Sequence, residues 1–482
     1  MKTRSCPYFR QTTDSNLKDA RFTLRYCRCR RRICQHNPPD SATNHGAVGP
    51  ESGSKSKLLF TLVVGIIFVF TLLLIMLRPR GLPEAISASA AALLVVIGGF
   101  VRPAEAGRVL AGEWNVFGFF LGLMTIASVA DSAGFFDSVA LFAARRACGS
   151  GRRLYLAVFA LGTLITAVLS NDATALILTP VVYTLVTKLR MKVLPFMFAC
   201  TFIADTASFL LPVSNPINIL VLNTFGSSLP QFLAHLLLPS LFCIGVNVAV
   251  FSWLFRDALD VEYDPALLEE PERTPEQQGF FRFVVGALLL IAAGYILASL
   301  FEIPLSFVAL AGAGVLLLGA TAFGQLQWRR TAQDISWSIF AFIGGMFVLV
   351  RAVEDAGLTA AFGRLVLAGA KTPFGTVVRV TLGTALGANL INNVPMALVM
   401  TSAIRSQPLL AAPVQQAAVY GTIFGADLGP NLTTVGSLAT MLWLLILRRR
   451  GLDISSREYF KLGMMVVPIM LLGGAFLIVW RP

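Results

Sequence analysis

Hydrophobic residues dominate the chain from residue 58 onward and gather in runs long enough to cross a bilayer. A transmembrane helix needs roughly 20 apolar residues. Eight runs meet this length, at 58–77, 83–101, 114–130, 233–255, 282–300, 304–322, 336–353 and 458–480. Four further apolar segments, 154–187, 195–224, 375–404 and 413–447, are interrupted by polar residues, Gly or Pro. The pattern predicts an all-α polytopic membrane protein.

The interrupted segments form two matching pairs. In the first half, SNDATALILTPVV (170–182) is followed by IADTASFLLPVSNPINI (203–219); in the second, INNVPMALVM (391–400) is followed by GADLGPNLTTVGSLAT (425–440). The aligned polar positions are Asn171-Asp172 with Asn392-Asn393, at an offset of 221, and Asp205 with Asp427, at 222. Duplicated halves with interrupted hydrophobic segments at corresponding places are typical of secondary transporters and indicate where the binding site lies.

The repeats predict a specific topology. We expect each pair to comprise a re-entrant hairpin and a broken spanning helix, so that each half crosses the membrane five times. The fold would then have two inverted-topology repeats, with about ten transmembrane helices, two re-entrant hairpins and two broken helices. Basic loops such as 145–153, 188–192 and 448–457 fall on one side, which the positive-inside rule assigns to the cytoplasm.

The expected domains are a basic, disordered tail at 1–57, a first repeat at 58–256, an acidic cytoplasmic linker at 257–281 and a second repeat at 282–482. We expect the first hairpin to open to the cytoplasm and the second to open outward.

Composition narrows the class of protein. The chain is 56% hydrophobic and 13% charged, about half the charge of a soluble protein. Its formal charge of +13 lies largely in the tail and short loops, which favours anionic lipid over nucleic acid as a partner. There is no GxxxxGK[ST] sequence, so coupling to ATP would require a partner protein. The seven cysteines show no metal-ligand or disulfide spacing, and no cofactor or metal is expected.

Polar residues at the interruptions are the candidate site. Asn side chains at hairpin tips can satisfy free backbone groups and still present donors and acceptors to a ligand; the alternative is that they only cap the hairpin turns. The expected substrate-binding residues are Asn171, Asp172, Ser214, Asn215, Asn392, Asn393, Thr433, Thr434 and Ser437.

Two carboxyl groups are candidates for proton coupling. Asp205 and Asp427 lie at equivalent helix breaks, and an acidic residue inside a membrane segment is costly enough to suggest a function. An N-cap role for each is the alternative and is compatible with proton binding. Asp131 and Glu354, also equivalent, are interpreted as structural ends of scaffold helices. Segments 154–187 and 406–447 contain no Lys or Arg to pair with a carboxylate substrate. This favours a neutral hydrogen-bonding solute, or a cation, exchanged against protons.

Several stretches together resemble the bacterial arsenite efflux permeases of the ion-transporter superfamily. They are DSAGFF (131–136), NDATALILTP (171–180), FIADTAS (202–208), NNVP (392–395) and GADLGPNLTTVGSLATMLW (425–443). The resemblance covers residues 58–480 and implies an inner-membrane transporter, not an enzyme. Such a protein exports undissociated arsenite and antimonite by proton antiport, or with ATP when an arsenite-stimulated ATPase docks on the cytoplasmic face. The four tail cysteines, Cys6, Cys27, Cys29 and Cys34, are extra to the family's usual short N-terminus.

Other functions stay open at this point. A sodium-coupled anion carrier, a sodium–proton antiporter or a silicic acid exporter could use the same fold. An intramembrane aspartic protease is a more distant alternative, since Asp205 and Asp427 form a pair of membrane aspartates. The characteristic Gly-x-Gly-Asp is absent, however, because Asp427 lies in FGADLG.

Overall fold

The chain is described by a computed structural model that covers residues 51–77, 79, 82–226, 228–268, 272–301 and 303–480. Within these ranges the secondary structure is helical, apart from one isolated bridge between Ser150 and Glu262. The expected all-α polytopic fold is confirmed. The tail cysteines and most of the expected disordered tail lie outside the described residues.

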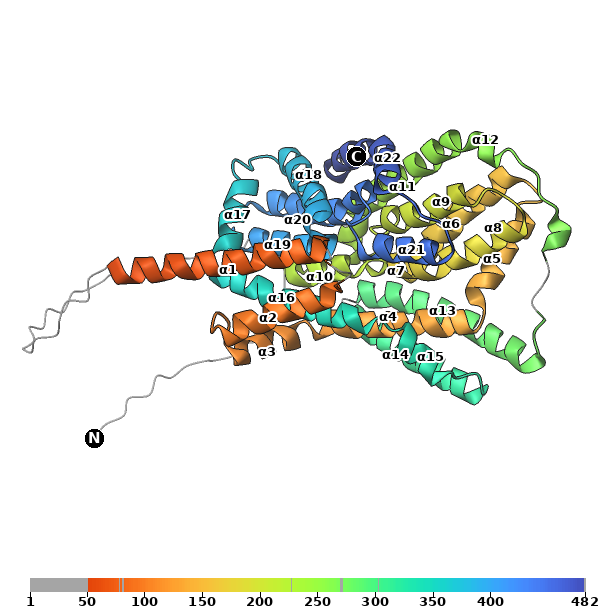
Figure 1. The fold of residues 1–482 in the computed structure, drawn as a ribbon, viewed down its shortest axis with the longest axis horizontal. Coiled ribbons are helices and arrows are strands. Elements are labelled where there is room, and N and C mark those ends of the chain that lie inside the picture. The colour runs from red at the N-terminus through yellow and green to blue at the C-terminus, as the bar shows by residue number, and fades with distance from the viewer. Residues whose placement is uncertain are drawn as a thin grey trace, which may run out of the picture. The chain divides into compact units, whose positions relative to one another are not determined.

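The two halves present their elements in the same order (Figure 1). The first half contains α1 (Glu51–Leu77), α2 (Glu84–Ile97), α3 (Pro103–Gly112), α4 (Trp114–Ser132), α5 (Phe135–Arg146), α6 (Gly151–Val168), α7 (Asn171–Ala173), the π-helical turn η2 (Thr174–Leu178), α8 (Thr179–Lys188), α9 (Val193–Thr206), η3 (Pro212–Ser214), α10 (Pro216–Phe225) and α11 (Leu229–Leu254).

A linker with α12 (Arg256–Leu259) and η4 (Pro265–Leu267) follows. The second half contains α13 (Pro275–Leu300), α14 (Leu305–Ala322), α15 (Trp328–Asp334), α16 (Trp337–Asp355), α17 (Leu358–Val366), α18 (Pro373–Ile391), α19 (Asn393–Arg405), α20 (Ala412–Leu428), η5 (Gly429–Leu432), α21 (Leu438–Arg449) and α22 (Ser456–Val479).

Nine helices in the described part of the chain are long and apolar enough to cross a membrane. Two of them, α6 and α18, are the first arms of the expected hairpins. The other seven correspond to uninterrupted crossings. The remaining expected crossings are shorter pieces, namely α2, with 14 residues, and the broken helices α9–α10 and α20–α21. Helix length alone therefore counts hairpin arms as spans and misses the broken helices.

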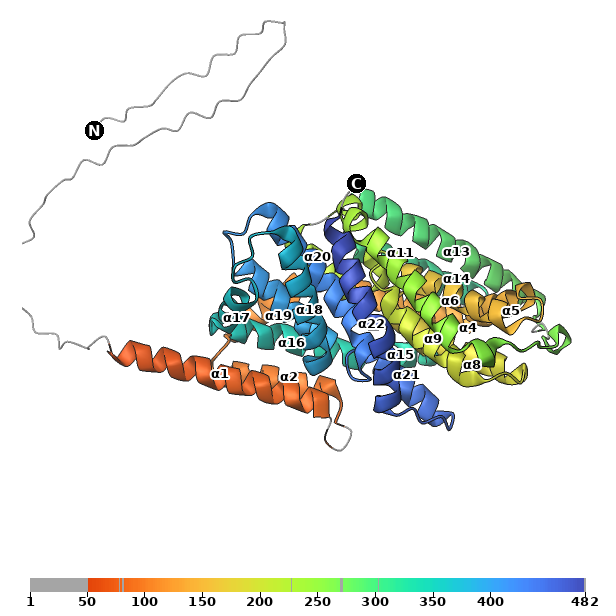
Figure 2. The same cartoon turned by 90° about the horizontal axis from the view of Figure 1, so that it is seen from above.

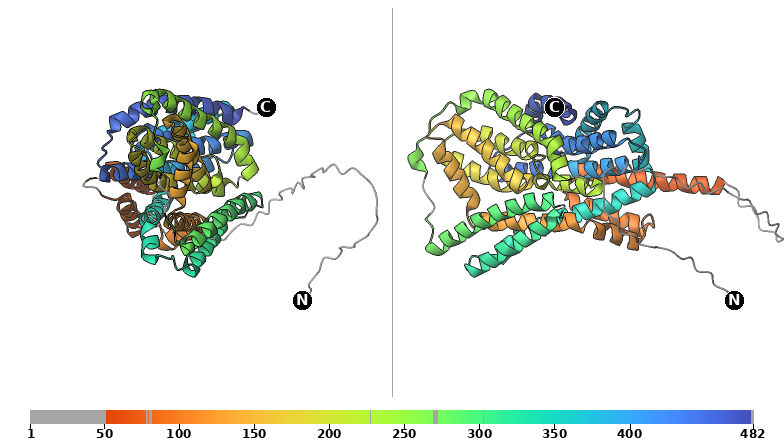
Figure 3. Two further views of the ribbon diagram at one scale, coloured as in Figure 1. Left: turned by 90° about the vertical axis from the view of Figure 1, so that its right-hand side faces the viewer. Right: turned by 180° about the vertical axis from the view of Figure 1, so that it is seen from behind.

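The helices form two layers (Figures 1 and 3). The first, which we call the scaffold, consists of α2, α3, α4 and α13–α16, with α4 packed on α14 and α16 packed on α2. The second, the transport layer, consists of α6–α11 and α18–α22, with α20 packed on α18 and α22 on α11 (Figure 2). Each layer contains helices from both halves, so the halves are interleaved.

Glycine in the left-handed conformation ends each of the two equivalent scaffold helices. Gly134 after α4 has φ of 70° and Gly357 after α16 has φ of 74°, a region that costs little only for glycine. Each turn leads into a short amphipathic helix, α5 or α17, that passes from the scaffold to the transport layer. The DSAGFF stretch is therefore a helix stop and a change of direction.

Ion pairs between the halves brace the scaffold at both ends. At one end, Arg330 of α15 lies 2.7 Å from Asp131 of α4. At the other, Arg351 of α16 lies 2.7 Å from Glu105 of α3; within α16 it also lies 3.3 Å from Glu354. These contacts give Asp131 and Glu354 structural roles, in agreement with the interpretation from the sequence.

The linker is attached to the base of the first hairpin. The backbone N–H of Gly151, where α6 begins, donates to the carbonyl of Val261, and Tyr263 bonds in turn to the carbonyl of Gly149. The Tyr263 hydroxyl donates to the carbonyl of Ala144 on α5. The linker thus joins α5 and α6 as well as connecting the two repeats.

Candidate functional site

Four helices begin at one small cavity between the two layers. The first residues of α7, α10, α19 and α21 are Asn171, Pro216, Asn393 and Leu438, and all four line this cavity. Its volume is 30 Å³, which gives room for about two water molecules. The scaffold closes it with Phe120 of α4 and with Ile339 and Ile343 of α16. We call this space the central cavity.

Side-chain caps explain why the helices start there. Asn215 accepts a hydrogen bond from the N–H of Ile217 at 3.0 Å, and Pro216 occupies the first helical position, where it loses no helical hydrogen bond. Ser437 accepts from the N–H of Thr440 at 3.1 Å. These two caps are 222 positions apart, the same spacing as Asp205 and Asp427.

The hairpin tips are capped in the same way, which corrects one alignment made from the sequence. The cap of α7 is Ser170, whereas the cap of α19 is Asn392. Ser170 is thus equivalent to Asn392 and Asn171 to Asn393, at an offset of 222 instead of 221. Asn392 has φ of 74° and ψ of 155°, a strained backbone conformation that glycine adopts far more readily than asparagine. Asn171-Asp172 and Asn392-Asn393 are both pairs of polar residues, so the sequence alone did not show that the alignment is shifted by one residue.

The two buried aspartates lie behind the central cavity and are held by residues that line it. Asp205 accepts hydrogen bonds from Asn171 at 3.4 Å and from Ser437 and Thr440 at 3.3 Å each. Asp427 accepts from Nδ2 of Asn215 at 2.9 Å. Each aspartate therefore bonds to the cap of the broken helix in the opposite half.

The nine predicted substrate-binding residues fall into two groups. The central cavity is lined by five of them: Asn171, Asp172, Asn215, Asn393 and Ser437. The other four do not line it. Ser214 donates to the carbonyl of Ala167, Asn392 to that of Val435, Thr433 to Asn389, and Thr434 shares a hydrogen bond with Ser456. Ser214 and Asn392 therefore bond to backbone carbonyls, and Thr433 and Thr434 bond to other side chains.

The electrostatic character of the cavity comes from backbone dipoles. Its lining contains no Lys or Arg, and its one acidic residue is Asp172. Each helix N-terminus has a partial positive charge of about half an elementary charge. Four such ends converge here, which offsets the negative charge of the nearby carboxyl groups. The cavity thus offers hydrogen-bond donors and a carboxylate acceptor.

Two larger spaces lie on either side of the central cavity. The inner vestibule, of 650 Å³, shares Phe120 and Asp172 with the central cavity and reaches Arg449 and Arg450. Those arginines belong to the basic segment that the positive-inside pattern assigns to the cytoplasm. The outer vestibule, of 360 Å³, lies between α3 and α16 on one wall and α10 and α19 on the other.

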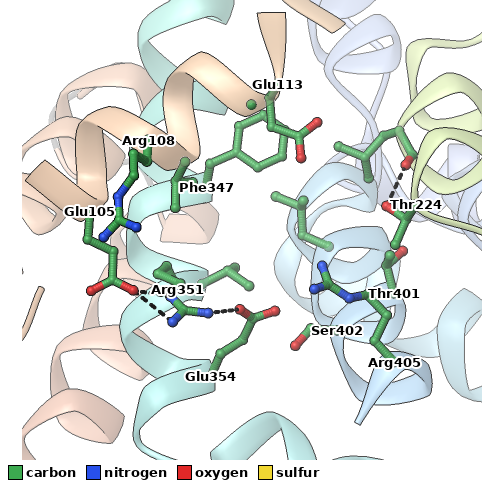
Figure 4. Close-up of a pocket in the computed structure, with 15 residues that line it drawn as sticks. Glu105, Arg108, Glu113, Thr224, Phe347, Arg351, Glu354, Thr401, Ser402 and Arg405 are labelled. Carbon is green, nitrogen blue, oxygen red and sulfur yellow. Dashed lines mark hydrogen bonds and ion pairs between the residues drawn. The ribbon is translucent and has the colours of Figure 1, made fainter. Parts of the chain in front are cut away.

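Charged residues of both signs face the outer vestibule (Figure 4). Arg351 pairs with Glu105 and Glu354 on the scaffold wall, and Arg405 at the end of α19 stands on the opposite wall. Glu113, between α3 and α4, is partly buried. Burial raises the pKa of its carboxyl above the ordinary value, and the positive charge of Arg405 partly offsets that rise.

Comparison with known proteins identifies the family. The sequence model of the family described as "Arsenical pump membrane protein" matches residues 62–481. The chain belongs to the arsenical pump membrane protein family. It is 32% identical over 417 residues to the "Arsenical pump membrane protein" of Escherichia coli (strain K12), a match covering 85% of this chain and 96% of that one. The protein of the same name from Yersinia enterocolitica is 32% identical over 414 residues, with the same coverage.

A solved structure shares the fold of this arsenical pump family member. It is the YdaH transporter of Alcanivorax borkumensis, described as having an unusual topology. The match has a TM-score of 0.50 at 13% identity and covers 87% of this chain and 97% of the other. Family membership and the apolar helices of the described residues make the chain a multi-pass membrane transporter.

Sequence reasoning missed several residues of the site. Thr440 bonds to Asp205, and Phe120, Ile339 and Ile343 close the cavity from the scaffold. Thr440 could have been found from its position three residues after the cap Ser437, where a helix N-terminus presents side chains to the same place. The three apolar residues carry no signal, because they lie in uniformly hydrophobic runs.

Proposed function

We propose that this chain exports undissociated trivalent arsenic and antimony hydroxides across the inner membrane in exchange for protons. The observation that carries the proposal is the lining of the central cavity, where four helix N-termini, amide and hydroxyl groups and Asp172 converge without Lys or Arg. Family membership supports an arsenical substrate.

The chemistry of the substrate matches this lining. Each hydroxyl of arsenous acid both donates and accepts a hydrogen bond. Backbone N–H groups and Asn amides can donate to its oxygens, and the Asp172 carboxylate can accept from a hydroxyl. A di- or tricarboxylate would instead require a cationic partner, and the lining has none. The proposal therefore favours a neutral hydroxide over the anion carriers considered from the sequence.

The small volume of the central cavity requires the two layers to move relative to each other before substrate can enter. A cavity of 30 Å³ has room for about two water molecules, whereas the hydroxide carries three hydroxyl groups on its central atom. The scaffold wall of Phe120, Ile339 and Ile343 must move relative to the helix N-termini to admit it. Opening toward one vestibule and then the other would carry the substrate across, and a proton on Asp205 or Asp427 would drive the return.

Everted membrane vesicles test the proposal. With respiration generating an acid interior and no ATP present, vesicles containing this chain should accumulate labelled arsenite, and a protonophore should abolish the accumulation. Vesicles without the chain are the control. Accumulation that requires ATP and an added soluble fraction would replace proton antiport with an ATPase partner. Sodium-dependent citrate uptake without arsenite movement would overturn the proposal.

A further inference from the structure

Three residues contact both the central cavity and a buried carboxyl group. Asn171 and Ser437 line the cavity and donate hydrogen bonds to Asp205, and Asn215 lines it and donates to Asp427. Substrate and proton would therefore act on the same side chains. This arrangement supplies a physical connection between the two ligands of an antiporter.

The connection at Asn215 is the shorter and more constrained. The oxygen and nitrogen of its amide make different hydrogen bonds. Oδ1 accepts from the N–H of Ile217 at 3.0 Å, and Nδ2 donates to Asp427 at 2.9 Å. An ionised carboxylate only accepts hydrogen bonds, so it holds the amide in the orientation that caps α10. The second carboxylate oxygen, Oδ2, has no hydrogen-bond partner among the described residues, because the nearby Ser208 hydroxyl donates to the carbonyl of Asp205.

Protonation of Asp427 would change these demands. A protonated carboxyl accepts the Nδ2 hydrogen bond of Asn215 only as a neutral group, and a hydrogen bond to a neutral acceptor is about half as strong as one to a carboxylate. The amide would then be held less firmly in the orientation that caps α10, and loss of a cap typically costs about 1 kcal/mol of helix stability. The helix N-terminus that lines the cavity would loosen, which would weaken substrate binding.

Ser437 occupies the equivalent position in the second half. Its hydroxyl donates to Asp205 and accepts from the N–H of Thr440, so it also caps a cavity-lining helix while holding a carboxylate. The ionisable groups near Asp205 are Asp172 from α7 and Tyr459 from α22, and the one near Asp427 is Asp205 from α9. All of them are acidic, so the donors that hold the carboxylates are neutral side chains, among them the caps Ser437 and Asn215.

We propose that Asn215 and Ser437 are positioning residues that make substrate binding and protonation of Asp427 and Asp205 mutually exclusive. Each acts by tying the N-terminal cap of a cavity-lining helix to the charge of the carboxyl group in the opposite repeat. The inference rests on the proposed arsenite–proton exchange and names the residues that would couple it.

Substitutions at the two caps test the coupling. Asn215→Ala removes the cap of α10 and the donor to Asp427, and Ser437→Ala removes the cap of α21 and the donor to Asp205. Asn215→Ser keeps both the cap and the donor, as Ser437 does at the equivalent position. Asn218→Ala is the matched control, because Asn218 is buried on the same helix but donates only to the carbonyls of Ser208 and Leu211.

The measurement is the number of protons released per arsenite moved, in proteoliposomes with a pH-sensitive dye and labelled arsenite. We expect this ratio to fall toward zero in Asn215→Ala and Ser437→Ala, because the side chain that ties the carboxyl group to the helix cap is gone. Arsenite should still exchange down its gradient. The ratio should be unchanged in Asn215→Ser and in Asn218→Ala, even where the rate is lower.

The outcomes separate the inference from the proposed function. If the unaltered protein releases no protons with arsenite, the proposed exchange is wrong and the inference fails with it. If the unaltered protein is coupled and Asn215→Ala and Ser437→Ala both keep the same ratio, only the inference fails. Should Asn215→Ala be absent from the membrane, Ser437→Ala decides, since it makes the equivalent change in the other repeat.

Discussion

The close approach of α18 and α20 makes a sharp prediction about stability. A Cβ added at Gly425 would lie 2.5 Å from the carbonyl oxygen of Thr381 and 2.9 Å from Cβ of Thr384, where ordinary contacts are 3.4–4 Å. The oxygen belongs to helix backbone and cannot move aside. Gly425→Ala should therefore force the two helices apart by about 1 Å and destabilise the fold by about 1–3 kcal/mol, the usual range for overpacking.

A matched glycine on α18 should respond in the opposite direction. Gly383 is also within a helix, but a Cβ there would have no neighbouring atom within 4 Å. Gly383→Ala should be neutral or stabilising by up to about 1 kcal/mol, because it removes the entropic disadvantage of glycine in a helix. Unfolding by SDS in mixed micelles measures both free energies.

The same displacement should affect coupling. Asp427 lies two residues after Gly425, so separation of the helices should lengthen the 2.9 Å hydrogen bond from Asn215. We expect Gly425→Ala to lower proton-coupled arsenite accumulation as well as stability. If Gly425→Ala is as stable as the unaltered protein, or no less stable than Gly383→Ala, the packing of α20 on α18 is looser than described here and the reasoning is refuted.

Three further predictions concern charged groups. Asp205→Asn and Asp427→Asn keep shape but cannot titrate, so these variants should exchange arsenite without concentrating it; full pumping by both single variants and the double variant would place proton coupling elsewhere. Arg351→Gln removes ion pairs with Glu105, Glu354 and Asp355 and should cost about 1 kcal/mol in the same SDS assay, with high salt shrinking the difference. Burial raises the pKa of Glu113, so its ionised form opposes folding. Glu113→Gln should therefore raise thermal stability at neutral pH. This gain should vanish as the pH falls and Glu113 takes up a proton. A gain that grows at acid pH would contradict that sign.

Much of the membrane architecture could be predicted because bilayer thickness imposes a length on apolar runs. The seven uninterrupted spans fall close to the expected ranges, and the breaks near Asp205 and Asp427 occur where Pro and Gly stop the helices. The residues at the breaks were harder to assign. Asn, Ser and Thr can either face a ligand or satisfy unwound backbone, and the sequence does not record which way a side chain points.

Ser214 and Asn215 illustrate that limit. They are adjacent and polar, yet Ser214 turns to the carbonyl of Ala167 while Asn215 reaches Asp427 in the other half of the chain. The second contact spans 212 residues and depends on how the repeats interlock. No local pattern encodes it. The repeat symmetry does contain the information, because the equivalence of Asn215 with Ser437 follows from the same offset that pairs the two aspartates.

The hydrogen bonds and ion pairs between the two repeats determine which parts of the molecule can move as units. Each buried aspartate is bound to a helix cap of the opposite repeat, so separating the repeats would break both hydrogen-bond sets in the core at once. The scaffold is braced between repeats in the same way, by Arg330 with Asp131 and by Arg351 with Glu105. A motion of one repeat against the other would therefore be costly in both layers.

A motion of the transport layer against the scaffold leaves these contacts intact. It changes mainly the apolar contacts of Phe120, Ile339 and Ile343 at the cavity wall, which can slide without losing hydrogen bonds. The inverted repeat thus sets the symmetry of the site, and we expect the moving boundary to run between the layers.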